Sequence, residues 1–214
     1  MEMIRGARVE QIQNGLVRGF LHLPGEPNGS GFVLAHGAGS NASAPLLVAA
    51  AQFIAAQGSA VLRIDLPFRQ KRPHGPPLPG MAEEDRRGIE EAAAAIRQYA
   101  AGAVTLGGHS YGGRQACMLA ADKPHVASRL LLFSYPLHPP AKPSQLRTAH
   151  FSRLTTPALF VHGAKDSFGT IQEMTAALTE IPARTECLPV EGAGHELRGG
   201  KLDWPAIWDR LASL

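Results

Sequence analysis

Ser110 lies at the centre of GHSYG, residues 108–112, which fits the pattern G-x-S-x-G. A short apolar run, residues 104–106, precedes it, and an alanine-rich helical pattern follows at once. A serine on a sharp strand-to-helix turn has strained backbone angles, and glycine two residues away on either side avoids a steric clash. The pattern therefore predicts an exposed hydroxyl that acts as a nucleophile. The alternative is an ordinary glycine-rich turn between a strand and a helix.

Two later residues could activate that hydroxyl. Asp166 follows the apolar run 158–161, and His195 ends a glycine-rich loop. A serine hydroxyl is a poor nucleophile at neutral pH, so a histidine must remove its proton and later give that proton to the leaving group. An aspartate beside the histidine fixes its tautomer and stabilises its positive charge. We therefore predict that Ser110, Asp166 and His195 act together; the alternatives are a capping acid and a loop histidine without a role.

The small residues HGAGS, at positions 36–40, follow the apolar run 31–35. Such a loop lets the backbone approach a ligand closely, and with the residue after the nucleophile it can supply two amide N–H groups to an oxyanion. We predict that these amides belong to Ala38 and Tyr111. The alternative is a plain loop at the end of a strand. His36 is expected to be a buried, hydrogen-bonded structural residue.

Three further side chains are candidates for contact with a substrate. Arg69 lies in residues 67–79, which prolines bias away from helix and which form either a solvated loop or a cationic loop facing the substrate. Arg114, on the helix after the GHSYG turn, could bind an acyl carboxylate or, as we favour, pair with an acid below the site. His138, in the loop after the apolar run 129–133, could line the pocket.

Strands and helices alternate along the chain from residue 31 onward. Continuous apolar runs predict buried strands, and apolar residues repeating every three or four positions predict helices. The predicted strands are residues 31–35, 60–64, 104–106, 129–133, 158–161 and 184–190. The predicted helices are residues 44–57, 81–100, 170–181 and 204–214, with one more directly after Ser110. This alternation predicts an α/β fold, a mostly parallel sheet with helices on both faces and a site beyond the carboxyl ends of its strands.

Two strand candidates precede the alternation. Residues 7–13 and 16–23 are joined by Asn14-Gly15, a strong signal for a two-residue hairpin turn. With them the sheet has about seven or eight strands. Only about twenty residues separate the fourth and fifth strands of the alternating part, which leaves no room for a large lid. We therefore predict one domain spanning residues 1–214.

The composition suits a globular protein, since 44% of the 214 residues are hydrophobic and 18% are charged. The net charge of +3, from 21 basic and 18 acidic residues, is too small to indicate nucleic-acid binding. The N-terminus lacks the apolar core of a signal peptide, and no apolar run is long enough to span a membrane. We therefore expect a soluble cytoplasmic protein, with Cys117 and Cys187 as unpaired buried thiols in a reducing compartment. No side chains show convincing metal-ligand spacing, and no cofactor is expected.

Five motifs carry a family resemblance: HGAGS at 36–40, GGHSYGGR at 107–114, SYPLHPP at 134–140, HGAKDSFG at 162–169 and GAGH at 192–195. From residue 31 to residue 195 the chain resembles the α/β-hydrolase superfamily, in its small lidless branch near dienelactone hydrolases. More narrowly, it is similar to a bacterial family of predicted hydrolases related to testis-expressed and chromatin-complex subunit proteins of animals. The resemblance implies an α/β-hydrolase fold with a serine nucleophile and no known substrate. Dienelactone hydrolases use a cysteine nucleophile, so Ser110 departs from them and their substrate is not transferred.

These observations predict a serine hydrolase that cleaves a carboxylic ester or related acyl bond of a small molecule through an acyl-enzyme. One alternative is a non-catalytic binding module on a hydrolase scaffold, since fold does not determine function and relatives of this kind belong to chromatin complexes. Another is a thioesterase or acyltransferase, in which the basic residues 67–79 would meet an anionic carrier. The sequence does not indicate the oligomeric state.

Overall fold

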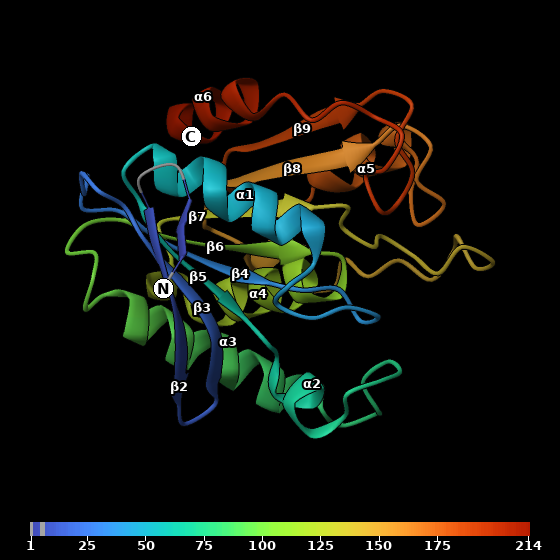
Figure 1. Cartoon of the computed structure of the whole chain (residues 1–214). Helices are drawn as coiled ribbons and strands as arrows, with labels where there is room; N and C mark the ends of the chain where they lie inside the picture. The colour runs from blue at the N-terminus through green and yellow to red at the C-terminus, as the bar shows by residue number, and fades with distance from the viewer. Residues whose placement is uncertain (1, 5–6) are drawn as a thin grey trace.

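The computed structural model describes residues 2–4 and 7–214, which contain one nine-stranded sheet with helices on both faces (Figure 1). The strand order across the sheet is β1-β2-β3-β5-β4-β6-β7-β8-β9. The strands are β1 Glu2–Ile4, β2 Ala7–Asn14, β3 Val17–Leu23, β4 Gly31–Ala35, β5 Ala60–Ile64, β6 Val104–His109, β7 Arg129–Phe133, β8 Ala158–Gly163 and β9 Thr185–Val190.

The larger part of the sheet is parallel. β4 pairs in parallel with β5 and β6, and parallel pairing continues through β7 and β8 to β9. The strands β1, β2 and β3 are antiparallel, and β3 joins them to the rest of the sheet by antiparallel pairing with β5. The predicted α/β fold with a mostly parallel sheet is confirmed. The additional strand is β1, which is too short to give a recognisable sequence pattern.

The hairpin between β2 and β3 turns one residue later than the sequence indicates. Asn14 pairs with Val17, so the two turn residues are Gly15 and Leu16. Gly15 has φ 57°, a left-handed backbone angle that glycine adopts without steric cost. The hairpin itself is confirmed, but the placement of its turn at Asn14-Gly15 is wrong because Asn14 still belongs to the ladder.

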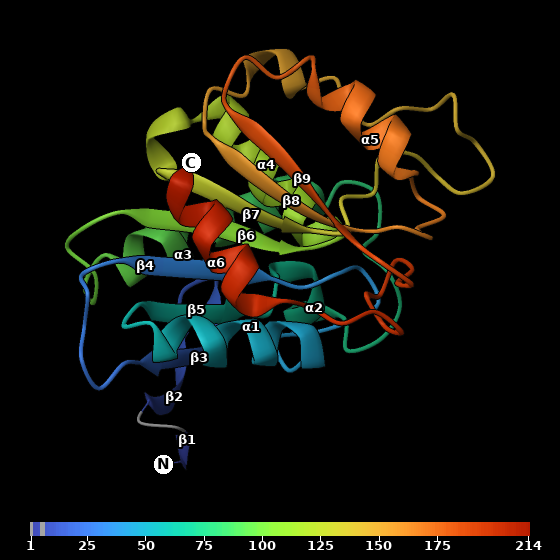
Figure 2. The same ribbon diagram turned by 90° about the horizontal axis from the view of Figure 1, so that it is seen from above.

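Two groups of helices cover the two faces of the sheet (Figure 2). On one face lie α1 (Pro45–Ala56) and α6 (Trp204–Ser213), and on the other lie α3 (Ala82–Ile96), α4 (Tyr111–Asp122) and α5 (Ile171–Leu178). Each group buries its own apolar cluster against the sheet. Full burial of one leucine, isoleucine or phenylalanine side chain contributes about 1.5–3 kcal/mol, so these clusters hold the strand ends in fixed positions.

Residues 67–79 begin with a helix, contrary to the expectation of an irregular segment. Helix α2 spans Pro67–Lys71, and its proline stands at the start, where the missing N–H costs no helical hydrogen bond. The buried carboxylate of Asp85 accepts the amide of Phe68 at 2.9 Å, which satisfies one of the free donors of this short helix. Only the part after α2 is without helix or strand.

The loops after the parallel strands gather along one edge of the sheet, at the right in Figure 1. The regular structure between β7 and β8 is limited to one 3₁₀ turn, Phe151–Arg153, so this connection forms no large lid. The edge therefore stays accessible, and it is where the predicted site residues lie.

Cys117 and Cys187 are both free thiols; the first is buried and the second is half-buried. In the part of the chain that the structure describes, none of the helices has the length and apolar character needed to cross a bilayer.

Candidate active site

Ser110 forms the turn between β6 and α4, with φ 51° and ψ −114°. A Cβ atom on Gly108 would overlap the carbonyl group of Ala35, and one on Gly112 would lie 2.5 Å from the carbonyl oxygen of His36. The backbone on either side of the serine thus passes so close to the end of β4 that only glycine fits. The strained turn has the geometry that the G-x-S-x-G spacing predicts.

The structure brings Ser110, His195 and Asp166 together in one line of hydrogen bonds. Nε2 of His195 lies 2.8 Å from Oγ of Ser110, and Nδ1 lies 2.8 Å from Oδ2 and 3.0 Å from Oδ1 of Asp166. The histidine side chain is 15% exposed, and the aspartate side chain is fully buried. With Nδ1 donating its proton to the carboxylate, Nε2 is free to accept the serine proton.

Each of these side chains follows a different strand. Ser110 comes after β6, Asp166 after β8 and His195 after β9. Because these strands are parallel, all three residues lie at the same edge of the sheet. The amide of Lys165 donates to the carbonyl oxygen of Ala193 at 2.8 Å. This bond joins the loop that carries the acid to the loop that carries the histidine.

Phe168 contacts both the acid and the histidine. Its amide donates to Oδ1 of Asp166 at 2.8 Å. Its ring is stacked on the imidazole of His195, with the centroids 4.0 Å apart and the planes inclined by 28°. One face of the imidazole is thus covered by an apolar ring, and the carboxylate receives a backbone donor in addition to the histidine.

Two further histidines lie beside this line. Nε2 of His162 donates to the carbonyl oxygen of Gly169 at 2.8 Å and lies 3.6 Å from Oδ2 of Asp166, while Nε2 of His109 donates to the carbonyl oxygen of His195 at 2.9 Å. Burial lowers the pKa of both imidazoles, so both are neutral at pH 7. In the part of the chain that the structure describes, no group of three or more His, Cys, Asp or Glu residues is arranged to hold a metal ion.

The predicted oxyanion amides lie on the two backbone segments that border Ser110. Tyr111 is the first residue of α4, so its amide lies outside the hydrogen-bond ladder of that helix. Ala38 lies in the loop after β4, and its amide donates to no backbone or side-chain group of the described residues. A Cβ atom on the neighbouring Gly37 would be 3.6 Å from Cβ of Ser110, so this loop passes directly beside the serine. Both amides are therefore available to a ligand oxygen.

His36 holds the loop after β4 in place. Its Nε2 accepts the amide of Leu66 at 3.1 Å, and its Nδ1 donates to the carbonyl oxygen of Gly37 at 2.8 Å. The side chain is fully buried, and this burial lowers its pKa to about 4. The prediction that His36 is a buried, hydrogen-bonded structural residue is confirmed.

Arg69 does not face a substrate as the sequence suggested. The residue is only 5% exposed, and its guanidinium donates to the backbone carbonyls of Ala38, Ser40, Arg72 and Gly75. All three guanidinium nitrogens are engaged in these bonds. The physical reason for the difference is that α2 turns the side chain inward, where it fastens the loop after β4 to the segment after α2.

The side chain of Tyr111 points to a buried acid on α3. Its hydroxyl donates to Oδ2 of Asp85 at 2.6 Å, and its ring meets that of Phe68 edge to face. Burial raises the pKa of Asp85, and burial together with this hydrogen bond raises the pKa of Tyr111. Tyr111 is thus anchored through its side chain, which leaves its amide free of that anchoring role.

Arg114 and His138 differ in their hydrogen bonds and charged neighbours. Arg114 lies one helical turn after Ser110 and, among the residues that the structure describes, has no acid partner; its Nε is buried without a hydrogen bond. The expected pairing with an acid below the site is therefore not observed. His138 is 4% exposed; its Nδ1 donates to the carbonyl oxygen of Pro139 at 3.0 Å, and its Nε2 lies 3.5 Å from the carboxylate of Glu173.

Residues 28–203 match the sequence profile of a family described as an alpha/beta hydrolase domain. The chain belongs to the α/β-hydrolase family. The match covers β4 to β9 of the hydrolase, and so it includes Ser110, Asp166 and His195.

Solved structures share the fold over nearly the whole hydrolase chain. The dienelactone hydrolase from Anabaena variabilis is 19% identical, with a TM-score of 0.72, over 97% of this chain and 95% of that one. An alpha-beta serine hydrolase homologue from Coxiella burnetii is 16% identical, with a TM-score of 0.70, over 96% of each chain. Est1E from Butyrivibrio proteoclasticus is 14% identical, with a TM-score of 0.69, over 97% of this chain and 96% of that one. At these identities the similarity establishes the fold.

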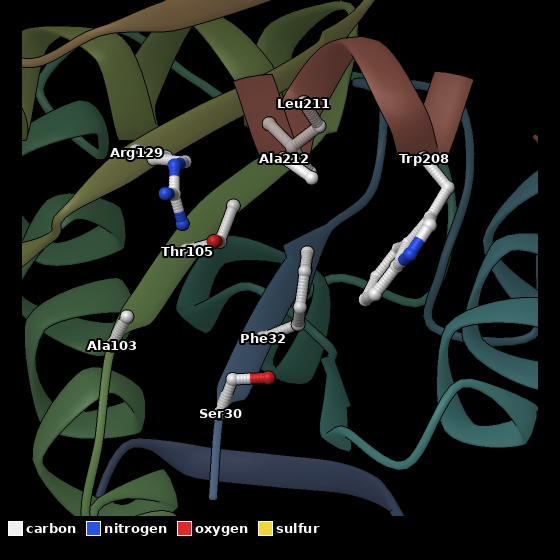
Figure 3. Close-up of a pocket in the computed structure, with 8 residues that line it drawn as sticks. All are labelled: Ser30, Phe32, Ala103, Thr105, Arg129, Trp208, Leu211 and Ala212. Atoms are coloured by element: carbon white, nitrogen blue, oxygen red, sulfur yellow. The ribbon is translucent and has the colours of Figure 1, made fainter. Parts of the chain in front are cut away.

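The hollow drawn in Figure 3 lies at the other end of the hydrolase sheet. It lies beside α6 at the amino ends of β4 and β6, and its lining includes Phe32, Thr105, Arg129 and Trp208. Its volume is about 120 Å³. Ser110 follows the carboxyl end of β6, so this hollow is not part of the candidate active site.

Sequence reasoning missed two residues that support the site of the hydrolase. Phe168 lies two residues after Asp166, and an aspartate that accepts the amide two residues on is a recognisable local signal. Asp85 gives no such signal, because its partners Phe68 and Tyr111 lie 17 and 26 residues away.

Proposed function

We propose that this α/β-hydrolase is a serine hydrolase that cleaves a carboxylic ester, or a related acyl bond, of a small molecule. The observation that carries the proposal is the line of hydrogen bonds from Asp166 through His195 to Ser110. The contact between the imidazole and the serine hydroxyl, at 2.8 Å, is within the range required for proton transfer to a general base.

The proposed reaction begins when Oγ of Ser110 attacks the carbonyl carbon and Nε2 of His195 takes the hydroxyl proton. The amides of Ala38 and Tyr111 donate to the negatively charged oxygen of the tetrahedral intermediate. His195 then gives its proton to the leaving alcohol, and the acyl group remains on the serine. A water molecule, deprotonated by the same imidazole, releases the acid and restores the free hydroxyl.

Asp166 acts on this reaction through the histidine. Its buried carboxylate accepts the Nδ1 proton and so fixes the tautomer in which Nε2 is basic. It also stabilises the imidazolium that forms in each half of the reaction. The backbone donor from Phe168 holds the carboxylate in the required orientation.

The finer family resemblance and the alternative functions remain predictions. One alternative is a non-catalytic binding module. It rests on the similarity to bacterial predicted hydrolases related to testis-expressed and chromatin-complex subunit proteins. Such a module needs no activated serine. A thioesterase or acyltransferase with an anionic carrier gains no support from Arg69 or Lys71 of the basic segment, because Arg69 is bound to backbone carbonyls and Lys71 pairs with Glu84 at 2.6 Å.

The proposal can be tested with a fluorophosphonate probe, which reacts with activated serines. The native chain should be labelled, Ser110→Ala should not, and His195→Ala should react roughly 10⁴-fold more slowly. Ser128→Ala, which changes an exposed serine far from the site, is the matched control and should be labelled like the native chain. A panel of short p-nitrophenyl esters would then define the acyl group.

One result would overturn the proposal. If the folded native chain is not labelled and hydrolyses none of the esters, Ser110 is not activated, and the binding-module alternative is favoured.

A further inference from the structure

Arg114, one turn after the proposed catalytic serine, and Arg147, which is hydrogen-bonded to the loop after β7, lack the partners that Arg69 and Arg153 have. Arg153 pairs with Asp122 at 3.0 Å, and Arg69 is bound by backbone carbonyls. Arg114 and Arg147 are both half-buried, and neither forms an ion pair with any carboxylate of the described residues. Buried cations are normally paired, because removing a charge from water without compensation is costly.

The hydrogen bonds of these two side chains are few. Nε of Arg114 is buried and has no hydrogen-bond partner among the described residues, while the rest of its guanidinium lies near the hydroxyl of Tyr135. The guanidinium of Arg147 donates once, to the carbonyl oxygen of Pro136, at the long distance of 3.3 Å. A guanidinium has five N–H donors in a planar fork, so the described residues leave most of the donor capacity of both groups unused.

Both arginines belong to segments that build the active site. The amide of Arg114 donates to the carbonyl oxygen of Ser110 at 2.9 Å, so it lies one turn along α4, and side chains on a helix lean back toward its N-terminus. Arg147 is fastened to the loop after β7, since its amide donates to the carbonyl oxygen of Leu137 at 2.8 Å. In the same loop the amide of His138 donates at 3.0 Å to the carbonyl oxygen of Phe168, whose ring covers the proposed general base.

The side chains around the two guanidinium groups do not neutralise them. Tyr135, which is 1% exposed, donates its hydroxyl to the carbonyl oxygen of Arg147 at 2.7 Å and lies 3.3 Å from Nε2 of His150. Burial, assisted by the charges of Arg114 and Arg153, lowers the pKa of His150 to about 4, so this imidazole is uncharged at neutral pH. Burial and the nearby charge of Arg114 lower the pKa of Arg147. The cluster therefore holds two mutually repelling cations among neutral groups.

We propose that Arg114 and Arg147 bind a carboxylate group that the substrate carries in addition to its scissile acyl bond. An anion between the two would remove their repulsion and use the empty donors, and the planar fork of arginine matches the two oxygens of a carboxylate. This inference rests on the proposed hydrolase function and narrows its substrate class to anionic esters. The sequence allowed two roles for Arg114, pairing with an acid or binding a substrate carboxylate. The proposal assigns it the second.

Three aryl esters that differ in the position of a carboxylate test the proposal on the full-length protein. The mono-p-nitrophenyl ester of glutaric acid carries a carboxylate on the acyl side, 4-acetoxybenzoate carries one on the leaving group, and p-nitrophenyl butyrate carries none. We expect the native hydrolase to show a higher kcat/KM for one of the two anionic esters than for the butyrate. The preferred ester identifies the side of the scissile bond on which the arginines act. The preference should shrink as ionic strength rises, because salt screens the attraction.

Arg114→Met and Arg147→Met keep most of the side-chain volume and remove the charge. In each variant kcat/KM for the preferred anionic ester should fall about 10- to 100-fold more than kcat/KM for the butyrate, as expected for the loss of a charge-assisted hydrogen bond. Arg153→Met, which removes an exposed arginine that already has a carboxylate partner, is the matched control and should keep the native preference. A purely structural role of the arginines would lower both activities equally, and that result would overturn the proposal.

Binding can be measured without turnover, which separates this proposal from the proposed function. Glutarate should raise the unfolding temperature of Ser110→Ala, and the increase should disappear when Arg114→Met or Arg147→Met is added. If no ester is cleaved but glutarate binds in this arginine-dependent way, the anion site stands and the hydrolase function fails. If esters are cleaved without any anionic preference and glutarate does not bind, the anion site fails and the hydrolase function stands.

Discussion

The imidazole of His195 lies against the ring of Phe168, with the two centroids 4.0 Å apart. In the proposed reaction this imidazole becomes a cation each time it takes a proton. The face of an aromatic ring attracts a cation within about 6 Å of its centroid. Phe168 therefore stabilises the charged form of the base and keeps water from one of its faces.

Phe168→Leu should lower kcat about 5- to 30-fold, because a partly desolvated cation–π contact contributes about 1–2 kcal/mol. Leucine keeps an apolar cover over the imidazole but has no aromatic face. Phe168→Tyr keeps that face and should retain most of the native rate. The measurement is kcat and KM on the best ester of the panel, and equal kcat values for the leucine variant and the native chain would contradict the prediction.

Arg69→Met should affect both stability and rate. It leaves the half-buried carbonyls of Ala38 and Ser40 without their donor, so the free energy of unfolding should fall by about 1–3 kcal/mol. Displacement of the Ala38 amide should lower kcat by up to about 10²-fold. Arg72→Met is the control, because it keeps the Arg72 carbonyl that accepts from Arg69 and removes a side chain for which no hydrogen bond to a described residue is observed. Loss of stability with an unchanged kcat would show that the loop keeps its position without the arginine.

Asp85→Asn should destabilise the fold by about 1–3 kcal/mol in urea unfolding experiments. The carboxylate accepts two donors, the amide of Phe68 and the hydroxyl of Tyr111, and an asparagine places an N–H₂ group against one of them. Tyr111→Phe removes only one of the two bonds and should cost less. A tyrosine variant that is less stable than the asparagine variant would argue against Asp85 as the common anchor.

The stability of the protein should fall as the pH is lowered from about 6.5 to about 4. Burial lowers the pKa of His36 to about 4, below the value of about 6.5 for an unfolded chain, so the unfolded state binds this proton more strongly. The contribution of neutral His36 is complete above that window and amounts to about 3 kcal/mol across it. His22 and His150, whose pKa values burial also lowers to about 4, add to the effect.

His36→Gln tests this pH dependence. Glutamine keeps an acceptor for the amide of Leu66 but does not titrate, so the free energy of unfolding should depend less steeply on pH in this variant. Urea unfolding at several pH values provides the comparison. Parallel pH profiles for the variant and the native chain would contradict the assignment.

Much of the fold could be predicted because buried parallel strands are continuous apolar runs. β4, β5 and β7 begin and end where those runs do. Ser110, Asp166 and His195 could be placed at one edge for a related reason: each follows a strand, and parallel strands have their carboxyl ends on the same side.

The contacts that could not be predicted join segments with no local pattern in common. Arg69 lies among prolines, and nothing in that stretch indicates that α2 will turn its side chain toward carbonyls about thirty residues earlier. The same limit applies to Asp85 and to the proximity of Arg114 and Arg147. These arrangements follow from tertiary packing, which composition and periodicity do not encode.

The strand order also indicates which part of the protein unfolds first in denaturant. β6, which leads to Ser110, has neighbours on both sides, whereas β9, which leads to His195, is the outermost strand and, among the described residues, pairs only with β8. Sub-global opening starts where the fewest contacts must be broken. Fraying of β9 would carry the base away from an otherwise intact serine turn. Inactivation by denaturant would therefore precede the loss of the central sheet, so residual secondary structure would overstate the fraction of working enzyme.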